Sequence, residues 1–162
     1  MSIVEAREYL KKYNLDKNIM EFDVSSATVK EAAIALNCKE EQIAKTLSFF
    51  VDDKPILIVA SGDSKIDNSK YKKVFKTKAK MIPFDLVEEY IGHQVGGVCP
   101  FGIKEGVDIY LDISLKKLDI FYPACGSSNS AIKLTYEELE NIIDYKTWID
   151  VCKDKENQKE GI

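Results

Sequence analysis

The sequence predicts an α+β domain with a mixed, mostly antiparallel, barrel-like sheet and surrounding helices. Two apolar runs, residues 46–51 and 55–61, flank the polar turn Asp52-Asp53-Lys54, which is typical of a β-hairpin. Helical and strand-like segments alternate irregularly, without the steady βαβ order of a doubly wound sheet. The length of 162 residues, with 45% hydrophobic and 31% charged residues, fits one globular domain. We expect this domain to span residues 1–150, followed by a frayed polar tail over 151–162.

Capping residues mark most of the expected helices. Thr28 and Thr135 each stand three residues before a glutamate, which is the capping-box pattern. Asp67 is a suitable N-cap, and Asn37 and Gly92 suit left-handed helix ends. These signals predict helices over residues 2–13, 28–36, 67–75, 84–91 and 135–143, with a helical turn over 40–44.

The strands are predicted from apolar and β-branched runs between turn residues. The run 55–61 is almost entirely apolar, so we expect that strand to be buried on both faces. The expected strands cover residues 18–24, 46–51, 55–61, 78–82, 107–112, 118–124, 130–134 and 145–149.

Composition narrows the class of protein. The chain has a net charge of −4, no apolar run that could cross a bilayer, and an N-terminus without an apolar signal segment. We therefore expect a cytoplasmic protein that does not bind membranes. Its four cysteines are scattered and it has one histidine, so no zinc set is recognisable. We expect free thiols, no metal and no cofactor.

A lysine-rich stretch, KYKKVFKTKAK over residues 70–80, interrupts the acidic average. It is either a solvated surface or a patch that meets phosphates. Its six lysines are Lys70, Lys72, Lys73, Lys76, Lys78 and Lys80.

The stretch GHQVGGVCPFG, residues 92–102, is the first candidate for chemistry. The chain has no serine-hydrolase elbow, Walker loop or metalloprotease motif, and His93 is its only histidine. Gly96 and Gly97 allow close approach of a ligand to the backbone, and Pro100 restricts the loop. Their N–H groups could stabilise a developing oxyanion in acyl-ester hydrolysis, or the loop could be a tight turn.

Other candidates have comparable alternatives. Cys99 is a nucleophile or a small pocket residue, and His93 is a base, a phosphate ligand or a half-exposed side chain. Lys45, at the start of an apolar strand, binds a phosphate, polarises a carbonyl or is simply exposed. The post-strand segments 61–63 and 126–129 either line the same cleft or form turns.

Four motifs in this order resemble the YbaK/EbsC family, free-standing relatives of the editing domain inserted in bacterial prolyl-tRNA synthetases. They are Q-x-x-K-T-L (42–47), I-V-A-S-G-D (58–63), G-G-V-C-P-F-G (96–102) and A-C-G-S-S-N-S-A-I-K-L (124–134). The resemblance covers about residues 1–150. It implies a mixed α/β fold and hydrolysis, in trans, of mischarged aminoacyl-tRNA, mostly tRNA for proline carrying Cys, Ala or another small amino acid.

The resemblance also implies site residues. Lys45 matches the functional lysine, and Gly96, Gly97 and Pro100 belong to the loop that positions the ester. The mechanism is expected to be substrate-assisted, with a ribose hydroxyl or substrate thiol replacing a side-chain base. The expected substrate-binding residues are Met20, Phe22, Ser61, Gly62, Asp63, His93, Val98, Cys99, Phe101, Gly102, Gly126, Ser127, Ser128 and Asn129. Two positions depart from the family pattern: Ala131 stands where cysteine-specific members often carry aspartate, and Cys99 replaces the usual serine.

The expected partners are the acceptor end of aminoacyl-tRNA and prolyl-tRNA synthetase, while the sequence leaves the oligomeric state open. Two alternatives belong to other functional classes. One is a non-catalytic module that binds tRNA or a synthetase. The other is a thiol-dependent hydrolase of small esters that uses Cys99 and His93.

Overall fold

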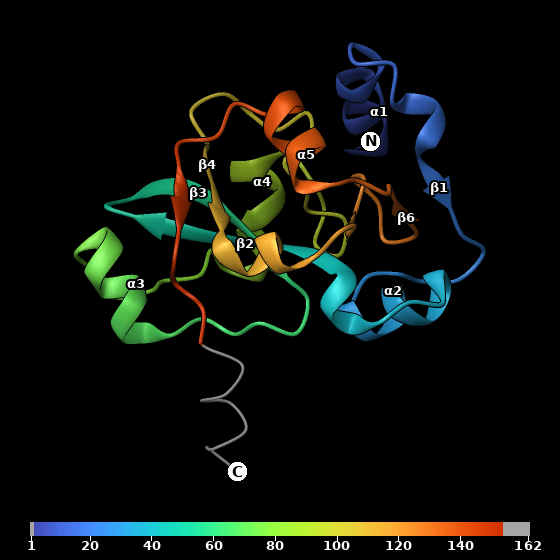
Figure 1. Ribbon diagram of the computed structural model, residues 1–162. Coiled ribbons are helices and arrows are strands. Elements are labelled where there is room, and N and C mark those ends of the chain that lie inside the picture. Colours follow the sequence, from blue (N-terminus) through green and yellow to red (C-terminus); the bar gives the residue numbers. More distant parts are fainter. Residues whose placement is uncertain (1, 154–162) are drawn as a thin grey trace.

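A central five-stranded sheet forms the core of this computed structural model, which describes residues 2–153 (Figure 1). Its strand order is β5-β2-β3-β4-β7, and a separate two-stranded sheet pairs β1 with β6. The strands are β1 Met20–Glu21, β2 Ile43–Val51, β3 Lys54–Ser61, β4 Asp108–Asp112, β5 Tyr122–Pro123, β6 Ser130–Ala131 and β7 Trp148–Ile149. The α-helices are α1 Ser2–Lys11, α2 Val29–Leu36, α3 Asn68–Phe75, α4 Val87–Ile91 and α5 Tyr136–Ile142.

The strand pairing confirms an α+β fold with a mixed sheet. The long β2–β3 hairpin and the small β1–β6 pair are antiparallel. The three shorter pairings, β2 with β5, β3 with β4 and β4 with β7, are parallel. Parallel neighbours need a crossover connection, and between β3 and β4 this connection contains α3 and α4.

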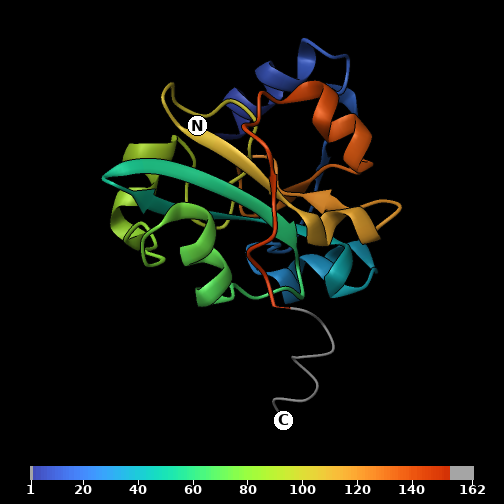
Figure 2. The same ribbon diagram turned by 60° about the vertical axis from the view of Figure 1, so that its left-hand side comes forward.

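The two faces of β3 pack against different helices, which confirms that this strand is buried on both faces. Leu57 and Val59 belong to a core cluster that includes residues of α1, α4 and α5. Ile58 and Ala60 belong to a second cluster with Tyr71 of α3. In both views α3 lies near the turn of the hairpin and α2 near its other end, while α1 lies beside α5 (Figure 2).

The expected capping residues of α2, α3, α4 and α5 are present in the structure, whereas α1 ends at Lys11 and not at residue 13. Thr28 and Thr135 form complete capping boxes with the glutamates three residues later. Asp67 caps α3 through the N–H groups of Ser69 and Lys70. Asn37 (φ 54°) and Gly92 (φ 100°) end their helices in the left-handed region.

Several expected strands are shorter than predicted. Residues 18–24 form only β1, and residues 78–82 contribute one isolated bridge, between Met81 and Phe49. The predicted strands 118–124 and 130–134 are reduced to two residues each. Outside these residues the two segments still pair with each other, because Phe121 and Leu134 form an isolated bridge with backbone bonds of 2.8 and 2.9 Å.

The ordered chain extends past the expected boundary at residue 150. Val151 and Cys152 are buried, and the Val151 carbonyl accepts from the Asp67 N–H at 2.8 Å. Residues 151–153 are therefore part of the fold rather than a frayed tail, while the rest of the expected tail, 154–162, lies outside the described residues. No helix in the described part of the chain is long and apolar enough to span a membrane.

Candidate active site at the open edge of β2

A cavity of about 510 Å³ opens where one edge of β2 lacks a neighbouring strand. β5 pairs with only Ile43 and Ala44 at this edge, and the segment 80–82 joins it again at Ser48 and Phe50. Thr46 lies in the gap between them. The other walls come from residues 26–29 and Ala32, residues 81–84 and Val87, three residues of the glycine loop (residues 92–102), and Tyr122, Ala124, Ser130 and Ala131.

Thr46 presents polar groups to this cavity. Its hydroxyl is buried and forms no hydrogen bond with any of residues 2–153. Its backbone N–H and C=O also point away from β3, towards the open edge. Ser48 and Phe50 form hydrogen bonds with the segment 80–82 at this edge, and in an antiparallel pair every second residue points its backbone groups to the same side. A buried hydroxyl without a partner costs about 1–3 kcal/mol, so it is a reasonable place for a ligand atom to bind.

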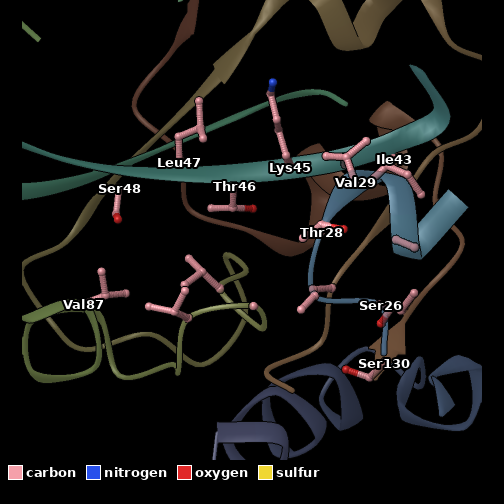
Figure 3. Close-up of a pocket in the computed structure, with 18 of the residues that line it drawn as sticks. Ser26, Thr28, Val29, Ile43, Lys45, Thr46, Leu47, Ser48, Val87 and Ser130 are labelled. Atoms are coloured by element: carbon pink, nitrogen blue, oxygen red, sulfur yellow. The ribbon is translucent and has the colours of Figure 1, made fainter. Parts of the chain in front are cut away.

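Alternation along β2 separates Thr46 from Lys45. The side chains of Thr46 and Ser48 lie on the side of the strand that faces Val87, whereas Lys45 and Leu47 point the other way (Figure 3). Lys45 contributes to the cavity lining, but its amine donates a hydrogen bond to the Ser64 carbonyl. Burial lowers the pKa of this amine. Lys45 therefore meets a ligand in the cavity only if its amine leaves Ser64.

The glycine loop, residues 92–102, forms part of the cavity wall next to the segment that leads into α2. Gly96 (φ 94°) lines the cavity, and a Cβ there would lie 3.0 Å from Cβ of Ala27. A Cβ on Gly97 would lie 2.5 Å from the Gly126 carbonyl carbon, so only glycine fits between the two loops. The Gly97 N–H donates to Gln94 and is not available to a ligand. Within residues 2–153, the N–H groups of Gly96 and Val98 have no such acceptor.

Cys99 and His93 lie in the core and not in the cavity. Both are fully buried, and the Cys99 sulfur is 3.5 Å from Nε2 of His93. Burial raises the pKa of the Cys99 thiol to about 12 and lowers that of His93. The His93 ring also pairs with the Phe101 carbonyl through Nε2 at 2.6 Å. This protonated, inaccessible thiol lacks the properties of a nucleophile, and the expectation of a half-exposed histidine is wrong.

Several residues expected to bind the substrate lie outside the cavity and instead join the segments around it by hydrogen bonds. The Gly126 N–H donates to the Gly97 carbonyl at 2.9 Å, and the Ser128 carbonyl accepts from the Ser26 N–H. Asn129 bonds to the backbone of Phe22 in both directions. The following residues are placed outside the cavity lining: Met20, Phe22, His93, Gly97, Cys99, Pro100, Phe101, Gly102, Gly126, Ser127, Ser128 and Asn129.

The segment 61–63 does not share a cleft with residues 126–129. Ser61 and Asp63 line a separate polar pocket of about 90 Å³, where the Ser61 hydroxyl donates to the Asp63 carboxylate at 3.0 Å. Gly62 packs tightly against the turn Glu40–Gln42, since a Cβ there would overlap the Glu40 carbonyl. Within residues 2–153 no cluster of acidic, cysteine or histidine side chains is arranged to hold a metal ion.

The lysine-rich stretch is largely at the surface. Lys72, Lys73, Lys76, Lys78 and Lys80 are exposed. Lys70 differs, because it is half-buried and forms an ion pair with Asp150 at 3.0 Å. The stretch leads directly into residues 81–84, which form one side of the cavity mouth.

Several lining residues were not expected from the sequence, among them Thr46, Ser48, Ser130 and Phe84. Thr46 and Ser48 alternate with apolar residues in β2, and this pattern is a signal for two polar side chains on one face. Ser130 and Phe84 carried no such signal, because folding alone brings their segments to β2.

The sequence matches one family profile and resembles proteins of known sequence over most of its length. Residues 23–142 match the family profile described as an aminoacyl-tRNA editing domain. The chain is 48% identical over 157 residues to the uncharacterised protein YwhH of Bacillus subtilis (strain 168), covering 96% of this chain and all of that protein. It is 25% identical over 119 residues to a proline–tRNA ligase of Bacillus cytotoxicus, covering 73% of this chain but only 20% of the ligase.

Solved structures share the fold. A candidate trans-editing enzyme for prolyl-tRNA synthetase superposes with a TM-score of 0.83 at 25% identity, covering 94% of this chain and 98% of the other. The hypothetical protein APE2540 gives a TM-score of 0.82 at 23% identity, covering 92% and 99% of the two chains.

Proposed function

This chain belongs to the aminoacyl-tRNA editing domain family, and we therefore propose that it hydrolyses mischarged aminoacyl-tRNA in trans. By similarity to the proline–tRNA ligases, the proposed substrate is tRNA for proline that carries a small amino acid. The observation that carries the proposal is the cavity at the gap in β2. Its lining combines the Thr46 hydroxyl, which has no partner among residues 2–153, with Gly96 and Val98, whose N–H groups have no backbone acceptor in that range.

We propose that the amino-acid part of the substrate binds inside the cavity at the open edge of β2. Its lining is largely apolar and includes Val29, Val87, Val98 and Ala131. The hydroxyl and outward carbonyl of Thr46 would accept hydrogen bonds from the substrate α-ammonium group. Ala131 is buried beside Met20 of β1 and offers no charge to a substrate thiol, which favours selection by size. Selection by size alone changes kcat/KM by about 10- to 200-fold between substrates that differ by one methylene.

The proposed reaction adds water to the ester carbonyl. The carbonyl oxygen would receive hydrogen bonds from the N–H groups of Gly96 and Val98 as it becomes an oxyanion. The ester C–O bond then breaks, the ribose oxygen takes a proton, and the amino acid and tRNA leave. Among the described lining residues none is Asp, Glu or His, so a neighbouring ribose hydroxyl of the substrate is the proposed proton relay.

Lys45 remains a proposed catalytic residue, provided that its amine can leave the Ser64 carbonyl. Its amine would exchange the Ser64 carbonyl for the terminal ribose or phosphate when the substrate binds. The exposed lysines of residues 72–80 would meet phosphates of the acceptor stem.

The decisive experiment is a deacylation panel with tRNA for proline charged separately with Ala, Cys, Ser and Pro, plus alanyl-tRNA for alanine. We expect rapid loss of one non-cognate ester while the prolyl ester is spared. Lys45→Ala should lower kcat/KM by about 100-fold or more. Lys11→Ala, which changes an exposed lysine of α1, should not.

Two results would contradict the proposal. Full activity of Lys45→Ala would remove its catalytic assignment. If the folded protein binds these tRNAs but hydrolyses none of the esters, the domain is a binding module.

A further inference from the structure

Three large apolar side chains are exposed at the mouth of the cavity. Phe84, Met81 and Val95 are 77%, 59% and 40% exposed, and all three line the cavity. The 77% exposure of Phe84 is the largest among the large hydrophobic side chains of residues 2–153. Gathering such side chains at one opening indicates a surface that a ligand covers.

The backbone holds Phe84 in place although its ring has little packing. Phe84 begins a 3₁₀ turn that ends at Leu86, and Pro83 precedes it with φ fixed at −53°. The turn continues into α4, whose Val87 is buried in the main core. A flat ring on an anchored turn loses little freedom when another flat group stacks on it.

Two exposed lysines that precede this patch in the sequence favour a nucleotide as the occupant, although Asp85, which follows Phe84, is exposed as well. Lys78 and Lys80 are exposed immediately before Met81, and Lys80 places its amine 5.8 Å from the centre of the Phe50 ring. Proteins that bind single-stranded nucleic acid combine exposed aromatic rings, on which bases stack, with lysines that pair with the phosphates. Residues 78–84 carry both kinds of side chain in one short segment.

We propose that Phe84, supported by Met81, stacks on the terminal base of the tRNA substrate, with Lys78 and Lys80 near the adjoining phosphates. This inference rests on the proposed function, because the ester in the cavity is attached to the terminal adenosine of the tRNA. When the aminoacyl group occupies the inner cavity, that adenosine lies at its mouth. Phe84 thus positions the substrate and takes no part in bond breaking.

The test compares two uncharged tRNAs for proline, one ending in CCA and one ending in CC, in binding assays at low salt. The wild-type protein should bind the CCA form about 5- to 150-fold more tightly, which is the range expected for stacking of one base. Phe84→Ala should lose most of this preference. Phe84→Trp should keep it, and Phe84→Leu, which is apolar but not flat, should not.

Ile34→Ala is the matched control, because Ile34 is 71% exposed and does not line the cavity. It should keep the full preference for CCA. Equal binding of the two tRNAs by the wild type, or an undiminished preference in Phe84→Ala, would overturn the inference and leave the patch to a protein partner. Because no hydrolysis is measured, a preference for CCA in a protein without deacylase activity would contradict only the proposed function.

Discussion

At the scale of single residues, Thr46 shows how this chain places an unpaired polar group in a sheet strand. Its neighbours in β2 satisfy their backbone groups through β3, β5 or the segment 80–82, but Thr46 stands where that edge is open. Its hydroxyl is buried without a partner among the described residues. Valine would have the same shape and would avoid this cost, so the hydroxyl is better explained by a ligand than by stability.

We therefore predict opposite effects of Thr46→Val on stability and activity. The free energy of unfolding should stay the same or rise by about 1 kcal/mol, because an unpaired buried hydroxyl is removed. The value of kcat/KM for the preferred ester should fall about 10-fold or more, as expected for loss of a hydrogen bond to a charged ammonium group. Urea unfolding and deacylation rates measure the two quantities. The exposed Thr147→Val is the control, and unchanged kcat/KM in Thr46→Val would refute the assignment.

At the scale of elements, the N-terminal end of α2 both carries a capping box and lines the cavity. Its capping box joins Thr28 to Glu31, with the Thr28 hydroxyl accepting from the Glu31 N–H at 3.1 Å. Thr28, Val29 and Ala32 also line the cavity, so the first turns of this helix form part of its wall. α5 begins with an equivalent box at Thr135, again with a 3.1 Å bond, but it does not line the cavity.

The two boxes give a matched pair of substitutions. Thr28→Ala and Thr135→Ala should each lower the free energy of unfolding by about 0.5–2 kcal/mol. Only Thr28→Ala should also lower kcat/KM, by up to about 100-fold, because a small displacement of the wall misplaces the substrate. Parallel urea-unfolding and deacylation measurements decide the matter. Equal loss of activity in both variants would mean that the effect is one of general stability.

At the scale of the whole molecule, burial decides which ionisable groups act and which support the fold. The sheet separates two cores, and His93 lies wholly inside the one that packs against α1, α4 and α5. Burial lowers its pKa below the usual 6.5, although the Phe101 carbonyl and Glu5 act in the opposite direction. A base with a lowered pKa in the folded state stabilises the protein fully above the unfolded pKa. This stability is lost as the pH falls towards the folded pKa.

The free energy of unfolding should therefore contain a His93 contribution that is constant above about pH 6.5 and declines below it. His93→Gln keeps a side-chain donor for the Phe101 carbonyl but does not titrate. The difference in unfolding free energy between wild type and His93→Gln should shrink as the pH is lowered from 8 to about 5. Urea unfolding at several pH values measures it. A difference that is independent of pH would show that His93 does not titrate on unfolding in this range.

The sequence by itself determined the features that depend on local chemistry. Capping threonines, left-handed helix ends and the apolar hairpin were readable because each is set by a few neighbouring residues. The motifs that contain Lys45 and Gly96 also lie on a strand and a loop that line the cavity proposed as the site.

Only the tertiary structure decided which of these residues meet in one cavity. Neighbours in a strand point to opposite faces, so Thr46 enters the cavity while the amine of Lys45 reaches Ser64. Cys99 and His93 belong to the glycine loop region, yet burial places them in the core. Phe84 and Ser130 come from distant segments, and their approach to β2 depends on crossovers and on the gap at its edge. Such long-range packing leaves no local pattern, because it is the sum of many weak contacts across the whole chain.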